Sequence, residues 1–239
     1  MKSQDILYLT RNNDCNLEEL TRSIYDEIFN EILKPNKLRL YRIWNYIPSI
    51  NINDRYKEFC NGRAASFAAN SCTNYPASTA VGSLSDKLDV YFIVGTDKDV
   101  IQIENPEQMP AYEYPVQDNF QPPSFSRALY CRKTLYISGT ASISGHKSLY
   151  PGNPELQCLR TVKNIEVLIS GNNLNKYGIN EDFNLKNLDS IKVYIRNTCD
   201  FPLIKHICEE NFSQDASIEY INTEICRPEL QVEIEGIIK

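Results

Sequence analysis

The sequence predicts an α+β fold in which helices pack on one face of mixed β-sheets. Three observations lead to this prediction. Apolar residues recur at helical spacing in four segments, they alternate in several shorter segments as strands do, and the order of these segments repeats once along the chain. We therefore expect two units of helix–strand–helix–strand over residues 1–97 and 98–239, the first unit lacking the hairpin that opens the second.

The first unit begins with a predicted strand over Ile6–Thr10. A helix is expected over Leu17–Leu33, where Asn16 or Asp14 can cap its start and Pro35-Asn36 is expected to stop it. The elements that follow are a strand over Leu38–Tyr46, a helix over Asp54–Phe67 and strands over Thr79–Val81 and Val90–Val94.

The second unit repeats this order in a longer form. Its expected elements are strands over Val100–Glu104, Arg127–Arg132 and Thr134–Ser138, a helix over Pro154–Leu168, a strand over Ile191–Arg196, a helix over Phe201–Phe212 and a strand over Leu230–Ile237. Between the first two strands, Pro106–Pro123 is rich in proline, tyrosine and polar residues. It is predicted to be a long ordered loop of the kind that carries function.

Composition excludes several classes of protein. Of 239 residues, 42% are hydrophobic and 23% are charged, as in ordinary globular proteins. The net charge of −6 and the lack of a Lys/Arg-rich block argue against a nucleic-acid or anionic-membrane surface. No apolar run is long enough to span a bilayer, and Met1–Arg11 does not resemble a signal peptide, so a cytoplasmic protein is expected.

Cysteine and histidine usage predicts neither disulfides nor a metal site. The eight cysteines include no C-x-x-C pair, and nothing indicates export, so free thiols are expected. The only two histidines, His146 and His206, fall in different predicted segments, so a metal site would have to be assembled from scattered residues. No metal and no organic cofactor is expected.

Several segments carry a resemblance to a known family. The most specific are Arg42-Ile-Trp-Asn-Tyr46, Ala111-Tyr-Glu-Tyr-Pro115 and Pro123-Ser-Phe-Ser-Arg-Ala128, and they occur in family order along the chain. Less specific matches are Ile137-Ser-Gly-Thr140 and Val232-Glu-Ile-Glu235. Together these segments resemble the chorismatases, whose catalytic domain has the YjgF/RidA-like fold.

The resemblance implies an enzyme that cleaves chorismate to pyruvate and a six-membered-ring acid. Chorismatases are usually longer at the N-terminus, so this chain is expected to be an N-terminally short member. RidA-like proteins are trimers with sites between subunits, and a homo-oligomer is therefore expected to cover the sheet that a shortened chain leaves exposed.

The resemblance also implies which residues bind the substrate. Arg63 and Arg127 are the candidates for holding the two carboxylates, because a planar guanidinium can bond both oxygens of one carboxylate. Tyr56 and Tyr114 match positions that offer phenolic hydroxyls to the substrate. The alternative is that the two arginines form salt bridges on the surface and that the two tyrosines are half-buried packing residues.

A buried carboxylic acid can protonate the methylene carbon of an enol ether if burial raises its pKa. Glu233 and Glu235 share one face of an alternating strand, and the resemblance selects Glu233 as the acid. The alternative is that both carboxylates lie on a solvated strand face. Gly139 and Cys226 match the subtype that forms 3-hydroxybenzoate, with Gly139 leaving room for the ring and Cys226 assisting aromatisation, although a buried cysteine is also commonly inert.

Three alternatives to this function stay open. One is hydrolysis of chorismate to a dihydroxycyclohexadienoate. Another is a RidA-type imine deaminase, although Tyr220 stands near the position where those proteins carry the arginine that binds the substrate carboxylate. The last is a protein that keeps the fold and binds a ligand without catalysis.

Overall fold

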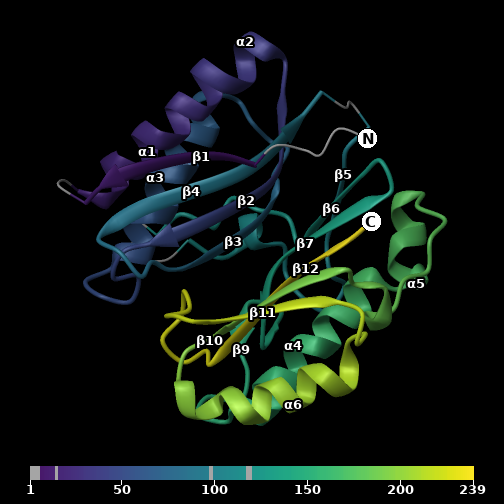
Figure 1. Cartoon of the computed structure of the whole chain (residues 1–239). Helices are drawn as coiled ribbons and strands as arrows, with labels where there is room; N and C mark the ends of the chain where they lie inside the picture. The colour runs from purple at the N-terminus through teal and green to yellow at the C-terminus, as the bar shows by residue number, and fades with distance from the viewer. Residues whose placement is uncertain (1–5, 14–15, 97–98, 117–119) are drawn as a thin grey trace.

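The structure is a computed structural model that describes residues 6–13, 16–96, 99–116 and 120–239. Its main feature is a pair of β-sheets that face one another, with helices on the outer face of each sheet (Figure 1). This arrangement confirms the predicted α+β class.

The first sheet has the strand order β1-β4-β2-β3, and the second has the order β11-β10-β12-β7-β6-β5. The strands of the first sheet are β1 (Ile6–Asn12), β2 (Arg39–Ile47), β3 (Ala77–Gly82) and β4 (Lys87–Gly95). Those of the second are β5 (Ile101–Ile103), β6 (Ala128–Cys131), β7 (Thr134–Ala141), β10 (Ser190–Ile195), β11 (Ser217–Asn222) and β12 (Val232–Ile238). The short pair β8 (Ile143–Ser144) and β9 (Lys147–Ser148) stands apart from both sheets.

Strand pairing confirms the predicted repeat. In the first sheet β2 pairs in parallel with β3 and antiparallel with β4, and in the second β10 pairs in the same two ways with β11 and β12. The pairing of β1 with β4 corresponds to that of β7 with β12. The second unit adds β5 and β6, so the hairpin β6–β7 has no counterpart in the first. The chain changes sheets between Gly95 and Ile101, residues 97–98 lie outside the described residues, and the division into two units there stays a prediction.

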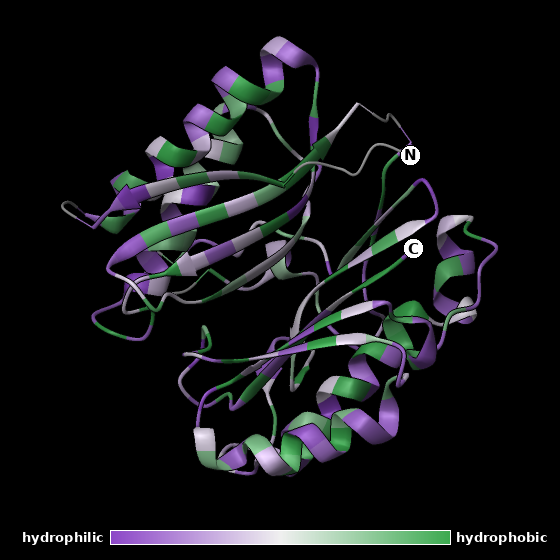
Figure 2. Ribbon diagram, in the orientation of Figure 1, coloured by the Kyte–Doolittle hydropathy of each residue, from purple (hydrophilic) through white to green (hydrophobic). Residues whose placement is uncertain are grey.

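Each sheet has its own apolar core under its helices. The helices are α1 (Leu17–Glu27), α2 (Lys34–Asn36), α3 (Arg55–Ala69), α4 (Pro154–Ile169), α5 (Gly171–Leu174) and α6 (Phe201–Asn211). Buried residues of α1 and α3 pack on β2 and β4, and buried residues of α4 and α6 pack on β7, β10 and β12. Figure 2 shows the outer helices with hydrophilic residues interspersed among the hydrophobic ones. The apolar residues that these helices bury therefore hold both outer layers on their sheets.

A third core joins the two sheets. Tyr41 and Trp44 of β2 and Ile93 of β4 meet Leu129 of β6 and Tyr136 of β7 between the sheets. These contacts fix the position of one unit against the other, and a site that draws residues from both units depends on them.

No helix in the described part of the chain is long and apolar enough to cross a membrane.

The first predicted helix ends later than expected. Asn16 caps its start, and Asp14 lies outside the described residues. The helix passes through Pro35 because the turn over Ile28–Leu33 is π-helical, with the Lys34 N–H bonded to the carbonyl of Phe29. It ends where Lys37 takes a left-handed conformation with φ of 54°.

Strand β11 and the small pair β8–β9 were not predicted. β11 lies at the edge of its sheet, where its residues are at most half-buried, so the apolar contrast along it is weak. Its alternation of Ile218 and Tyr220 with polar neighbours was nevertheless present in the sequence.

Candidate active site

The seven residues singled out by sequence analysis line one cavity of about 130 Å³ between the two units. α3 and the first sheet form one wall, and β7, β12 and the loop before β6 form the other. The seven residues are Tyr56, Arg63, Tyr114, Arg127, Gly139, Cys226 and Glu233. All of them belong to a single chain, and the predicted homo-oligomer stays a prediction.

Arg63 lies on α3 with its side chain buried and only partly bonded. Its Nη1 donates to Ser78 Oγ at 3.2 Å, while Nε and Nη2 have no hydrogen-bond partner among the described residues. Nε and Nη2 form the edge of a guanidinium that can bond both oxygens of a carboxylate. The rings of Tyr25 and Phe67 lie 5.3 and 5.4 Å from the guanidinium carbon and hold its plane. A buried cation with a vacant donor edge is a receptor for an anion.

Arg127 lies just before β6 and reaches the cavity from the opposite wall. Its Nη2 donates to the carbonyl of Met109 at 2.9 Å and to the hydroxyl of Tyr114 at 2.7 Å, and its Nε has no partner in the described part of the chain. Because Tyr114 accepts from Arg127, its own O–H proton is available to a ligand. The loop predicted to carry function thus supplies Tyr114, Phe120 and Pro123 to the cavity, and its residues 117–119 lie outside the described residues.

Cys226 and Tyr56 are both protonated at neutral pH. Burial is the main cause that raises the pKa of the Cys226 thiol to about 12, with a further contribution from the Glu233 charge. Burial also raises the pKa of Tyr56 well above its ordinary value. A thiol in this state is a poor nucleophile, and it can serve as a hydrogen-bond or proton donor. The seven cysteines that the structure describes form no disulfide bonds with one another.

Glu233 is buried on β12, with 4% of its surface exposed. Burial, and after it the charge of Glu235, raises the pKa of Glu233 to about 8, although Arg42 and Arg127 oppose the shift. The Glu233 carboxyl is therefore protonated at neutral pH and lines the cavity as an acid. The alternative of a solvated strand face is wrong, because the opposing sheet covers both Glu233 and Glu235, the latter also 4% exposed.

We expect kcat/KM to fall as the pH rises through about 8, because the protonated form of Glu233 is the one that can donate. The same shift makes the folded protein hold a proton that the unfolded chain releases above about pH 4.3. The contribution of Glu233 to stability is thus full below that pH and is lost as the pH rises to about 8. A pH profile of kcat/KM beside one of the melting temperature tests both statements, and a kcat/KM that keeps rising above pH 9 would contradict the role of Glu233 as the acid.

Gly139 lies against the Glu233 carboxyl. A Cβ added at residue 139 would stand 2.0 Å from Oε1 of Glu233 and 3.1 Å from Thr79 Oγ1. The nearer atom is the end of a flexible side chain, so Gly139→Ala should fold and push the carboxyl aside. We expect a melting temperature close to that of the wild type and a loss of kcat of roughly 100-fold, the usual cost of misplacing a catalytic group by about 1 Å. A Gly139→Ala variant with a clearly lower melting temperature, or with the kcat of the wild type, would contradict this account.

The sequence analysis did not single out Arg227 and Ser78, which also line the cavity. Arg227 Nη1 donates to the carbonyl of His146 at 2.9 Å and to Ser148 Oγ at 3.1 Å, and its guanidinium lies 5.5 Å from the ring of Tyr114. Its position directly after Cys226 was the available signal. Ser78 gave none, because its role depends on the pairing of β2 with β3.

Other charged residues lie elsewhere. Arg160 pairs with Glu107 at 2.8 Å, and Arg196 pairs with Glu224; neither arginine lines the cavity. Among the described residues, no three His, Cys, Asp or Glu side chains form a group that could hold a metal ion.

Comparison with known proteins places this chain in a family. A family model described as chorismatase FkbO/Hyg5-like, N-terminal, matches residues 4–94. A 3-hydroxybenzoate synthase of Streptomyces hygroscopicus is 36% identical over 237 residues, which cover 92% of this chain and 69% of that protein. The chain belongs to the chorismatase family.

Two further relatives agree with this assignment. A chorismatase of Streptomyces rapamycinicus is 33% identical over 231 residues and is covered to 69%. A crystal structure of a chorismatase superposes with a TM-score of 0.92 at 28% identity, over 98% of this chain and 73% of that one. As a member of the chorismatase family the protein is an enzyme, and the resemblance found in its sequence is confirmed.

Proposed function

We propose that this enzyme converts chorismate into pyruvate and a six-membered-ring acid, with 3-hydroxybenzoate as the favoured ring product. The observation that carries the proposal is a buried, protonated Glu233 in the same cavity as the vacant donor edge of Arg63. The names of the relatives, 3-hydroxybenzoate synthase and chorismatase, support the same substrate.

The cavity fits the chemistry of chorismate. The substrate carries two carboxylates, and the guanidinium groups of Arg63, Arg127 and Arg227 line the cavity. Phe59, Phe120 and Phe125 supply apolar surface for the ring. The hydroxyls of Tyr56 and Tyr114 are placed to orient the ring hydroxyl or the ether oxygen.

Glu233 starts the reaction by donating its proton to the methylene carbon of the enolpyruvyl group. Positive charge then develops on the ether-bearing carbon and its oxygen. Water adds there, and the resulting hemiketal collapses to pyruvate and the ring alcohol, which keeps the ether oxygen. A proton released from the added water restores Glu233. This sequence consumes one water and yields the dihydroxycyclohexadienoate.

Formation of 3-hydroxybenzoate requires one more step, the loss of a ring hydroxyl and a ring hydrogen as water. The overall conversion to 3-hydroxybenzoate then consumes no water. Cys226, a protonated thiol in the cavity, is the group we assign to assist departure of that hydroxyl. Gly139 keeps the space beside Glu233 open for the ring.

Chromatography of the ring product beside an enzymatic assay for pyruvate tests this proposal. Equimolar pyruvate and 3-hydroxybenzoate are expected. If the products are pyruvate and the dihydroxycyclohexadienoate, the enzyme still cleaves chorismate, but Cys226 does not assist loss of the ring hydroxyl. A rise in melting temperature with chorismate but no pyruvate would favour the binding protein without catalysis.

The imine deaminase alternative gains no support from the cavity. Tyr220, which stands near the position of the carboxylate-binding arginine in those proteins, lies on β11 with its ring 5.3 Å from that of Phe201 and does not line the cavity. A cytoplasmic location stays a prediction.

A further inference from the structure

Glu235 lies next to the acid but in a different environment. It follows Glu233 by two residues on β12, so both side chains leave the strand on the face that meets the first sheet. Both carboxyls are buried, but only Glu233 lines the cavity. Two buried carboxyls this close cannot both ionise without a large electrostatic cost.

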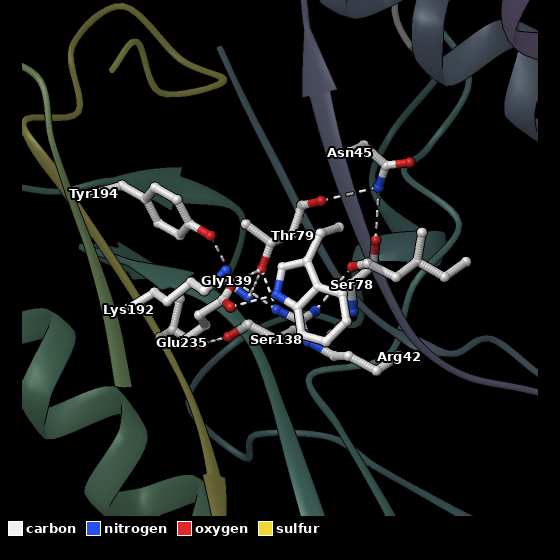
Figure 3. Close-up of polar contacts among 12 residues, drawn as sticks. Arg42, Asn45, Ser78, Thr79, Ser138, Gly139, Lys192, Tyr194 and Glu235 are labelled. Carbon is white, nitrogen blue, oxygen red and sulfur yellow. Dashed lines mark hydrogen bonds and ion pairs between the residues drawn. The ribbon is translucent and has the colours of Figure 1, made fainter. Parts of the chain in front are cut away.

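The Glu235 carboxyl is surrounded by hydrogen-bond donors. Oε2 of Glu235 accepts from Arg42 Nη2 at 2.5 Å, from the hydroxyl of Tyr194 at 3.2 Å and from the hydroxyl of Thr79. Oε1 accepts from the indole N–H of Trp44. Figure 3 shows Arg42, Thr79 and Tyr194 converging on this carboxylate. Four donors, one of them the Arg42 cation, are thus directed at the Glu235 carboxylate.

Arg42 is itself buried, with 1% of its surface exposed, and it forms an ion pair with Glu235. Its guanidinium carbon lies 4.8 Å from the Trp44 ring. The other cation near this group is Lys192 on β10, whose ammonium lies 5.5 Å from the Trp44 ring and 3.8 Å from Glu219. Tyr194 is neutral, because burial raises its pKa well above the ordinary value. Arg42 is therefore the counter-ion of Glu235.

We propose that Glu235, paired with Arg42 and hydrogen-bonded by Trp44, Thr79 and Tyr194, is a positioning residue whose negative charge keeps the catalytic proton on Glu233. This inference rests on the proposed function and adds a division of labour to it. One carboxyl of the Glu-Ile-Glu segment is a fixed charge, and the other is the acid.

The other groups that face Glu233 do not carry a negative charge that would keep the proton on its carboxyl. Arg42 and Arg127 are cations and act in the opposite direction, and Cys226 is a neutral thiol. Among the charged neighbours, Glu235 has the largest effect on the pKa of Glu233, second only to burial.

Thr79 connects this charge to the floor of the cavity. Its hydroxyl donates to Glu235, accepts from Arg42 and accepts from the Gly139 N–H at 3.0 Å. The backbone of Gly139 in turn lies against the Glu233 carboxyl. Glu235 therefore places a charge near Glu233, and through Thr79 it also contacts Gly139 of β7, the residue beside the Glu233 carboxyl.

Infrared titration of the protein without substrate tests the inference. The carbonyl band of protonated Glu233 is identified by its loss in Glu233→Gln and followed against pH in the wild type, in Glu235→Gln and in Glu235→Asp. We expect the titration midpoint to fall by roughly 1 pH unit or more in Glu235→Gln, because a like charge is removed. Glu235→Asp keeps the charge and should keep the midpoint near that of the wild type.

Glu235→Gln leaves Arg42 without its counter-ion, and this can destabilise the fold. The double variant Arg42→Met/Glu235→Gln removes both charges, and we expect its midpoint to fall by less than in the single variant. An unchanged midpoint in a folded Glu235→Gln or in the double variant would overturn the inference. Since the titration needs no turnover, pyruvate release measured separately shows whether the proposed function stands.

Discussion

Glu233→Gln should reduce pyruvate release by roughly 10²- to 10⁴-fold, the usual contribution of a positioned general acid. The change keeps the shape of the side chain and removes the proton that the methylene carbon needs. Chorismate should still raise the melting temperature, because Arg63, Arg127 and Arg227 remain in place. The measurement is single-turnover formation of pyruvate beside a thermal shift with chorismate.

Glu219→Gln is the matched control for this change. Glu219 lies on β11 of the same sheet, 62% of its side chain is exposed, and it does not line the cavity. It should leave both turnover and binding as they are in the wild type. Activity of Glu233→Gln within threefold of the wild type would remove Glu233 from the mechanism.

Arg63→Met should abolish tight binding of chorismate without weakening the unliganded fold. In the free protein the Arg63 guanidinium is buried, and two of its nitrogens lack partners among the described residues. The burial of this charge therefore costs free energy that an anionic ligand would offset further. Losing one partner of a buried charge pair weakens binding by about 2–5 kcal/mol, which is roughly a 30-fold to several-thousandfold rise in Kd. Calorimetric binding and thermal unfolding without ligand measure the two effects.

Arg160→Met serves as the comparison for Arg63→Met. Arg160 is paired with Glu107 outside the cavity, so its loss should leave the affinity for chorismate unchanged. If Arg63→Met binds chorismate as tightly as the wild type, then Arg63 does not hold a carboxylate and the orientation of the substrate in the cavity is wrong.

The fold was largely predictable because its helices and central strands have strong periodicity. The apolar face of α1 reflects the one buried side of that helix, whereas β2 is buried on both faces and is marked by its many apolar and aromatic residues. The prediction of elements failed where a strand is only weakly buried, and where a π-helical turn allows a helix to continue past a proline. The edge strand β11 is an example of the first case, and the π-helical turn before Pro35 is an example of the second.

The site was predictable only in part, because its parts come from two units that meet across the sheet interface. Family motifs identified Glu233 and Arg63, but no pattern within one segment could show that Ser78 bonds Arg63 or that Glu235 is paired with Arg42. Arg42 and Glu235 are 193 residues apart in the sequence. Such contacts follow from strand pairing and packing of the two sheets, and periodicity does not encode them.

The most direct test of the account is a single turnover of the wild-type enzyme with chorismate in D₂O, quenched rapidly and analysed by nuclear magnetic resonance. Protonation of the methylene carbon by an exchangeable Glu233 predicts pyruvate whose methyl group carries one deuterium from the solvent, formed in equal amount with the ring acid. Pyruvate with an unlabelled methyl group, or no pyruvate above the background of chorismate alone, would contradict the account.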